Sequence, residues 1–306
     1  MKSLSIGIFT DSELSDSLAK KGTSSDITLY NKKTDDCIYT FIVPHSYPEK
    51  ISSLIQTAQL VDAAVIVVDQ ITKDLGETIL ILDSLDMKNT FIHIKNPIDE
   101  QQLQSILNQT SLKYEKVSKE DLMQALDKIN PEQKDTKTKI IIDHSFQVKS
   151  VGTVALGFLK SGTIKPYDKL TALPAKKEAM IKSIQMQSKN VDTASAPARV
   201  GLSLKGIDVE DLDRGTVLTT KDMRSEKTFR IKYKKCPFYK GEIKEASRLH
   251  LSVGMQFREI TIKKIENNIL TVESQKPFAI DENDRIILID NSTTGLRLAA
   301  RGNITL

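Results

Sequence analysis

The sequence predicts a Rossmann-like α/β domain with a mostly parallel sheet, followed by two antiparallel β-barrels. Three observations indicate this fold. The first 130 residues alternate strand and helix signals and include the apolar run 63–68, which is typical of a strand buried on both faces. Residues 139–306 consist instead of short β-branched runs separated by turn residues, a pattern typical of antiparallel barrels. At 306 residues, the chain is also too long for one ordinary core.

The elements of the first domain, residues 1–130, follow one another in a regular order. An apolar strand over residues 4–9 and a helix over 12–20 precede two short strands, 27–30 and 38–43. The remaining elements are a helix from residue 51, the strand 63–68, a helix over 75–85, a strand over 91–94 and two polar amphipathic helices, the second of which starts at Ser118.

A polar stretch separates this domain from the barrels. Residues 131–138 contain a proline and no apolar residue, as expected of a linker. The strand patterns that follow suffice for two barrels. A join near residues 221–226 divides them into the domains 139–222 and 226–306.

The formal charge of +4 hides a division between the two parts of the chain. Residues 137–306 carry 30 Lys and Arg against 19 Asp and Glu, a net charge of +11, whereas the preceding residues carry 14 against 21, or −7. A basic C-terminal part attracts a polyanion such as RNA through phosphate neutralisation and counterion release. Proteins that bind no nucleic acid also show such asymmetry, so both interpretations stay open.

The composition argues against several other classes of protein. The longest apolar run is far shorter than the roughly 18–20 residues that cross a bilayer, and the N-terminus lacks the layout of a signal peptide. We therefore expect a cytoplasmic protein without membrane contact. Cys37 and Cys236 lie far apart in different predicted domains, which argues against a disulfide. The four histidines show no ligand spacing, and we expect no metal site.

Short motifs in the first barrel form an ordered series. They are Asp-His-Ser-Phe at 143–146, Val-Gly-Thr-Val-Ala-Leu-Gly at 151–157 and Gly-Thr-Ile-Lys-Pro-Tyr-Asp at 162–168, followed by matches at 184–187, 198–207 and 213–218. This series resembles the second domain of elongation factor Tu, the selenocysteine-specific elongation factor and the gamma subunit of archaeal initiation factor two. The resemblance implies a G-type α/β domain before this barrel and a third, barrel-shaped domain after it.

The resemblance also implies a nucleotide site in the α/β domain, but the residues that such a site needs are replaced. A phosphate loop uses glycine amides, a lysine and a hydroxyl group to bind the phosphates and magnesium. Here Thr10 and Ser15 stand at the glycine positions and Asp16 at the lysine position, while Ser17 alone keeps the hydroxyl. Two like charges about 4 Å apart cost on the order of 1–4 kcal/mol, so we expect neither GTP nor magnesium as a cofactor.

The other nucleotide motifs that the resemblance implies are altered as well. The aspartate and glycine of the DxxG segment align with Val43 and Ser46, and the place of the catalytic histidine falls near Tyr47. In the base-reading segment, which contains Asn96, the carboxylate of Asp99 matches the NKxD pattern only if the register slips by one position. We therefore predict no catalytic residue and a pseudo-GTPase.

In the elongation factors, the second domain holds the amino acid and the terminal adenosine of charged tRNA. Carried over position by position, the resemblance implies a pocket formed by Asp143, His144, Phe146, Leu156, Gln185, Gln187 and Arg199. The last four differ from the elongation factor Tu pattern, so a polar pocket is expected, and its specificity for charged tRNA stays open. Phe146 is expected either to pack in the barrel core or to stack on a base, and an ordinary exposed polar role is the alternative for His144 and Arg199.

A basic cluster opens the last domain. Alternation along a strand puts Arg230, Lys232 and Lys234 on one face. Further charge and stacking surface are expected near its end from Lys235, Lys240, Phe238 and Tyr239. RNA binding and an edge strand protected by lysines explain this pattern equally well.

These observations predict an elongation-factor-like protein that binds tRNA or ribosomal RNA through its barrels and does not hydrolyse GTP. The ribosome or other translation factors are further possible partners. Two alternatives remain. One is a GTP-binding elongation factor with atypical nucleotide motifs, and the other is a protein-binding mimic or regulator of elongation factors.

Overall fold

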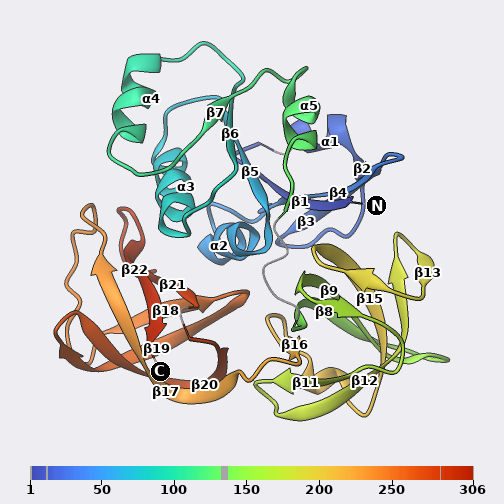
Figure 1. Cartoon of the computed structure of the whole chain (residues 1–306). Helices are drawn as coiled ribbons and strands as arrows, with labels where there is room; N and C mark the ends of the chain where they lie inside the picture. Colours follow the sequence, from blue (N-terminus) through green and yellow to red (C-terminus); the bar gives the residue numbers. More distant parts are fainter. Residues whose placement is uncertain (1, 12, 132–136, 283, 306) are drawn as a thin grey trace. The chain divides into compact units, whose positions relative to one another are not determined.

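The computed structural model describes residues 2–11, 13–131, 137–282 and 284–305 (Figure 1). It confirms the predicted architecture of an α/β domain with a mostly parallel sheet followed by two antiparallel barrels. The central part of the predicted linker, residues 132–136, lies outside the described residues. Among the helices that the structure describes, none is long and apolar enough to cross a membrane.

The α/β domain is built on a seven-stranded sheet with the order β2-β3-β4-β1-β5-β6-β7. Its strands β4, β1, β5, β6 and β7 run parallel, and β2 and β3 form an antiparallel edge. The bounds are β1 (Lys2–Phe9), β2 (Lys20–Lys21), β3 (Thr28–Lys33), β4 (Cys37–Val43), β5 (Ala63–Val68), β6 (Thr90–Ile94) and β7 (Glu115–Lys116). As its apolar run predicts, β5 is buried along its whole length.

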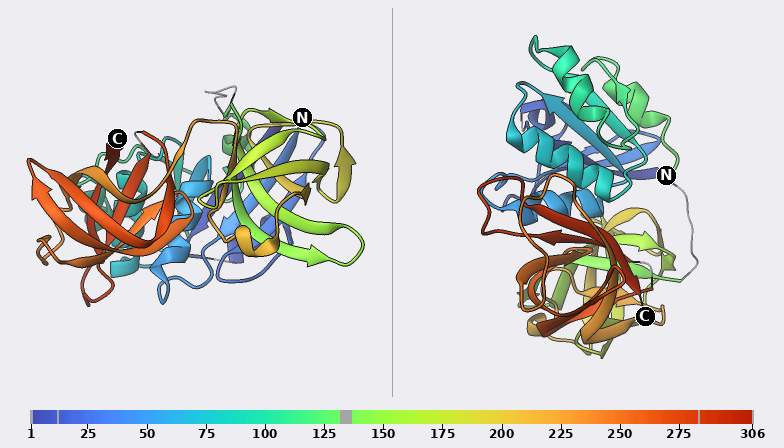
Figure 2. Two further views of the ribbon diagram at one scale, coloured as in Figure 1. Left: turned by 90° about the horizontal axis from the view of Figure 1, so that it is seen from below. Right: turned by 90° about the vertical axis from the view of Figure 1, so that its left-hand side faces the viewer.

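Helices lie on both faces of this sheet (Figures 1 and 2). On one face, Leu14, Leu122 and Leu126 of α1 and α5 join a core with residues of β1 and β5. The helices are α1 (Glu13–Leu18), α2 (Ile51–Leu60), α3 (Lys73–Ser84), α4 (Glu100–Leu107) and α5 (Leu122–Asp127). Helix α5 begins later than the predicted Ser118, because the hydroxyl of Ser118 bonds to the carboxylate of Asp121 at 2.6 Å and closes a turn there.

The first barrel closes through the pairing of β11 with β12, and its strand order is β11-β16-β8-β9-β15-β12-β13. Its interior is filled by aliphatic side chains. The strands are β8 (Lys139–Val148), β9 (Gly152–Ser161), β11 (Lys169–Leu173), β12 (Lys177–Met186), β13 (Lys189–Val191), β15 (Ala198–Lys205) and β16 (Val217–Thr219), with the small sheet of β10 (Thr163–Ile164) and β14 (Ala194–Ser195) and the 3₁₀ helix η1 (Val209–Asp211) beside them.

The second barrel is closed, with the order β17-β20-β19-β18-β21-β22. A Cβ atom on Gly302 would lie 2.1 Å from the carbonyl oxygen of Lys232, so only glycine permits this approach of the backbones. The strands are β17 (Arg224–Lys235), β18 (Arg248–Val253), β19 (Gln256–Glu266), β20 (Ile269–Ile280), β21 (Arg285–Ile289) and β22 (Leu298–Thr305).

The internal contacts divide the chain into two compact units. The first comprises residues 1–131 together with 235–241 and 287–301, and the second comprises the remaining residues. Two segments of the last barrel therefore belong to the same unit as the α/β domain.

Candidate functional site

A pocket of about 630 Å³ lies at the carboxyl ends of β1, β6 and β7. In open α/β sheets, ligands bind beyond these strand ends, because the loops there converge. The lining contains three lysines and three carboxylates, so its formal charges balance. They are Lys95, Lys116, Lys119, Asp11, Glu13 and Glu120.

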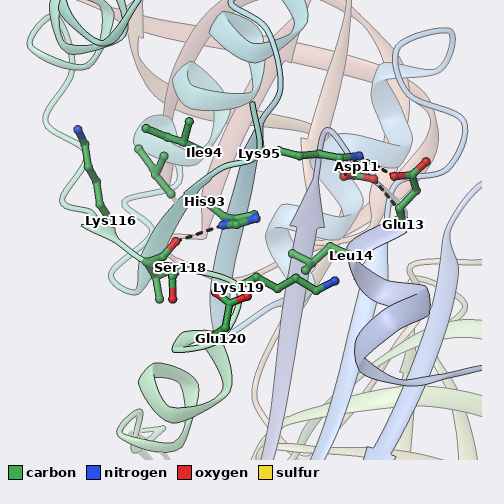
Figure 3. Close-up of a pocket in the computed structure, with 12 residues that line it drawn as sticks. Asp11, Glu13, Leu14, His93, Ile94, Lys95, Lys116, Ser118, Lys119 and Glu120 are labelled. Atoms are coloured by element: carbon green, nitrogen blue, oxygen red, sulfur yellow. Dashed lines mark hydrogen bonds and ion pairs between the residues drawn. The ribbon is translucent and has the colours of Figure 1, made fainter. Parts of the chain in front are cut away.

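One end of this pocket is closed by ion pairs. The ammonium of Lys95 lies 3.0 Å from the carboxylate of Asp11 and 2.6 Å from that of Glu13. Figure 3 shows these three side chains gathered together, while Lys116 lies at the opposite end. The hydrogen bonds from Lys95 to Glu13 and Asp11 raise the pKa of the lysine. The loop that follows β6 is thus held to the loop that follows β1.

None of the four residues predicted for the phosphate loop lines this pocket in the described part of the chain. The hydroxyl of Thr10 donates to the carbonyl oxygens of Phe9 and Val67, and the side chain of Ser15 is buried. The carboxylate of Asp16 is exposed on α1, close enough to Tyr30 to raise the pKa of that phenol, after the larger effect of burial. The hydroxyl of Ser17 bonds to the carbonyl oxygen of Leu14 at 2.7 Å.

Two of the carboxylates that line the pocket, Asp11 and Glu13, stand one and three residues after Thr10. Sequence reasoning passed over them because it compared each position with a phosphate-loop template. Their partner Lys95 directly precedes Asn96 in the predicted base-reading segment. A lysine in that segment was the sequence signal that could have pointed to Asp11 and Glu13.

The other predicted nucleotide residues point to different partners. The side chain of Asp99 caps helix α4, accepting from the backbone N–H of Gln102 at 3.0 Å, and Asn96 donates to the carboxylate of Asp69. Val43 is buried at the end of β4.

The segment that follows β4 faces helix α3. The backbone oxygen of Ser46 accepts from the N–H of Lys50 at 2.7 Å. The hydroxyl of Tyr47 lies 2.9 Å from the backbone oxygen of Asp74 and 3.1 Å from the carboxylate of Glu77. The side chain at the place of the catalytic histidine is thus bound to α3.

On the first barrel, the strand register brings several predicted pocket residues into one row. His144 of β8 pairs with Leu156 of β9, which pairs with Gly201 of β15, which pairs with Gln185 of β12. A Cβ atom on Gly201 would lie 3.3 Å from a methyl group of Leu156, so the glycine leaves room for that side chain.

Phe146 lies near this row, and Gln187 lies beyond its end. Phe146 is two residues along β8 from the row and 43% exposed, so the alternative of a core residue is wrong. Gln187 follows β12 in a turn, with a positive φ of 49°.

A buried ion pair lies beside this row. The guanidinium of Arg199 donates to the carboxylate of Asp143 at 2.8 Å and lies 5.6 Å from the ring centroid of Phe158. The second carboxylate oxygen of Asp143, the Nε of Arg199 and the Nδ1 of His144 are buried without a hydrogen-bond partner. Buried polar atoms are normally bonded, so these three atoms keep unused hydrogen-bonding capacity beside the row. The alternative of an ordinary exposed side chain is wrong for Arg199, whose side chain is 16% exposed and paired with Asp143.

The basic face of β17 is exposed as predicted from its alternation. Arg230, Lys232 and Lys234 are exposed. Phe229 and Ile231, which alternate with them, are buried. Two nearby carboxylates are paired with lysines of β19. Lys263 lies 2.7 Å from Glu273 of β20, and Lys264 lies 2.7 Å from Glu266 of β19 itself. Within the described part of the chain, no ion pair involves the three cations of β17, which remain available to an anionic partner.

The prediction that Tyr239 provides a stacking surface near the end of β17 is wrong. Its ring is buried, and its hydroxyl donates to the carboxylate of Asp290 at 2.6 Å. Lys235 lies over that ring and donates to the backbone oxygen of Gly241 at 2.7 Å, while Lys240 is exposed. Phe238 lines an apolar pocket of about 270 Å³ and is half-buried.

The fold and the first barrel define the class of protein. The family model "Elongation factor Tu domain 2" matches residues 152–219. This chain superposes on the solved structure of the translation elongation factor SelB from Methanococcus maripaludis with a TM-score of 0.82. The two sequences are 23% identical, and the match covers 100% of this chain and 80% of that chain. A bacterial selenocysteine-specific elongation factor gives a TM-score of 0.83 at 20% identity, over 99% of this chain and 58% of that chain. The chain therefore shares the fold of these elongation factors, an α/β domain followed by two β-barrels.

The sequence relatives complete this assignment. A selenocysteine-specific elongation factor of Methanocaldococcus jannaschii is 28% identical, over 93% of this chain and 71% of its own length. An uncharacterized protein of the same organism is 37% identical and matches 95% of this chain and 96% of its own length. The chain belongs to the translational GTPase superfamily.

Proposed function

We propose that this chain is a translation factor of the cytoplasm that binds tRNA or ribosomal RNA through its barrels and does not hydrolyse GTP. The observation that carries the proposal is the ion-pair cluster of Lys95 with Asp11 and Glu13. It lies in the loops where a nucleotide would bind in a fold of this kind.

The residues of this pocket do not fit a magnesium-bound triphosphate. Such a ligand needs excess positive charge, glycine amides and a hydroxyl for the metal. Residues 10–17 contain no glycine, and the lysines of the pocket are balanced by an equal number of carboxylates. The hydroxyl of Thr10 is bonded to backbone oxygens. The hydroxyl of Tyr47, at the place of the catalytic histidine, is bound to α3, which supports the proposed loss of a water-positioning group.

The RNA part of the proposal rests on charge. Residues 137–306 carry a net charge of +11, and the three cations of β17 point outward without an ion-pair partner in the described part of the chain. Successive outward residues on a strand are about 6.6 Å apart, which allows each to contact a separate phosphate. The exposed ring of Phe146, beside the row containing His144 and Leu156, supplies a second surface on which an RNA base can stack.

Two titrations test the proposal. Isothermal titration with GDP, with GTP and with magnesium is expected to give no saturable binding, and micromolar affinity would overturn the proposed loss of nucleotide binding. Binding of a tRNA pool is expected to weaken as salt rises, with a slope of about −0.7 to −0.9 per phosphate contact. Absence of RNA binding at low salt would favour the protein-binding regulator instead.

A further inference from the structure

Tyr47, Glu77 and Arg297 form a buried polar cluster within the first compact unit. The side chain of Glu77, on α3, is fully buried, and that of Arg297 is 13% exposed. The backbone N–H of Arg297 donates to one carboxylate oxygen of Glu77 at 2.8 Å, and its Nε lies 3.2 and 3.1 Å from the two oxygens. Its Nη2 donates to the same carboxylate. Arg297 therefore binds the carboxylate of Glu77 through both its guanidinium and its backbone N–H.

Arg297 also holds the segment of residues 44–50, which follows β4. Its Nη1 donates to the backbone oxygen of Pro48 at 2.8 Å, and its guanidinium carbon lies 5.7 Å from the ring centroid of Tyr47. The hydroxyl of Tyr47 donates to the carboxylate of Glu77 at 3.1 Å. One arginine thus fixes both a ring and a carbonyl group of the 44–50 segment.

Helix α3 is tied to residues 287–301 at two more places. The ammonium of Lys73 donates to the backbone oxygen of Thr294 at 3.0 Å, and Arg301 pairs with Asp83 at 2.8 Å. These contacts flank Glu77 along the helix. Displacing the 287–301 segment would leave the carboxylate of Glu77 buried without its cation, which is strongly unfavourable.

We infer that Glu77 and Arg297 lock the 44–50 segment in a single conformation that needs no bound nucleotide. In GTPases, the switch segments are ordered by the γ-phosphate and its magnesium ion and are released on hydrolysis. In this chain, the ordering groups belong to α3 and to residues 287–301. The lock goes beyond the proposed function, because it holds or fails whether or not the barrels bind RNA.

Hydrogen exchange on the full chain tests the lock. The backbone N–H groups of Tyr47 and Lys50 donate to Pro44 and Ser46 at 3.0 and 2.7 Å, so their exchange reports opening of the segment. The variant Arg297→Lys keeps the charge, and with it the fold, but loses the planar fork. We expect exchange in the 44–50 segment to be about tenfold faster in this variant, and unchanged in the matched control Arg248→Lys, which alters an exposed arginine of β18.

Nucleotide addition provides the second arm. Exchange of the 44–50 segment in the wild-type chain is expected to be the same without nucleotide, with GDP and with a non-hydrolysable GTP analogue, each with magnesium. Either a change in that exchange on adding nucleotide, or an unchanged rate in Arg297→Lys, would overturn the lock. Calorimetric binding of GTP with constant exchange would overturn the proposed loss of nucleotide binding and leave the lock standing.

Discussion

The ammonium of Lys95 lies 3.0 Å from the carboxylate of Asp11, which joins two loops that are 84 positions apart in the sequence. Glu13 adds a second carboxylate on the same ammonium at 2.6 Å. A cation at the carboxyl ends of the parallel strands is therefore matched by groups of the chain itself.

Removing these carboxylates should create affinity for a phosphate. In the double variant Asp11→Asn, Glu13→Gln, the ammonium of Lys95 is released and two negative charges are lost from the pocket. We expect the affinity for a fluorescent GTP analogue to rise by about tenfold or more, measured by fluorescence anisotropy at low salt.

The matched control for that experiment is Asp16→Asn. Asp16 is exposed on α1 and does not line the pocket, so its neutralisation should leave nucleotide affinity unchanged. A gain in Asp16→Asn without a gain in the double variant would show that the sequence-based assignment of Asp16 to the phosphate site was right and that Asp11 and Glu13 play no part.

The ion pair of Glu77 with Arg297 should contribute strongly to stability. Arg297→Met removes the only cation that contacts Glu77 among the described residues, and leaves that carboxylate buried and unpaired. We expect a loss of about 3–5 kcal/mol in the free energy of unfolding, measured by urea denaturation. The exposed pair Lys88 with Asp86 is the control, and Lys88→Met should have no measurable effect. Equal midpoints for the two variants would contradict this prediction.

The carboxylate of Asp290 should make the free energy of unfolding fall as the pH becomes acidic. Burial by itself would raise the pKa of Asp290, but hydrogen bonds from Ser292 and Tyr239 lower it below the ordinary value of 3.8. A depressed carboxylate pKa stabilises the folded state at pH values above the unfolded pKa, and this contribution is lost as pH falls through the folded pKa. Asp290→Asn should therefore be less stable than the wild type at pH 7, with a difference that shrinks below pH 4. Urea midpoints at pH 7, 5 and 3 measure it, and a constant difference would refute it.

The cations of β17 should set part of the salt dependence of RNA binding. Replacing Arg230, Lys232 and Lys234 with alanine removes up to three phosphate contacts, so the slope of log affinity against log salt should fall in magnitude by about 2–3. Filter binding over a salt series measures the slope. Lys263→Ala with Lys264→Ala is the control, because both lysines are paired with glutamates and their loss should change the slope less. Equal slopes for the two variants would place the RNA contact elsewhere.

Local pattern was sufficient for the architecture. The apolar run 63–68 predicted a strand buried on both faces, and alternation predicted the outward cations of β17, because both signals depend on neighbours a few positions away. The resemblance to the second domain of elongation factor Tu also implied that His144 and Leu156 share a pocket, and the strand register pairs these two residues.

The candidate site could be predicted only in part, for the same reason. The resemblance predicted an altered phosphate loop with Asp16 at the lysine position, whereas the acidic residues of this segment that line the pocket are Asp11 and Glu13. It treated Tyr239 as a stacking surface, although the folded chain buries that ring against Asp290. The direction of a side chain at the end of a helix or strand depends on packing, which periodicity does not encode.

The sequence by itself determined the order of the domains, the basic character of the barrels and the absence of phosphate-loop glycines, since these follow from residue type and short-range spacing. Only the tertiary structure decided that Lys95 meets Asp11 and Glu13, and that Arg297 meets Glu77 across 220 positions. Charged residues are numerous in any soluble chain. Which of them pair depends on the burial and orientation that the folded chain imposes on distant segments.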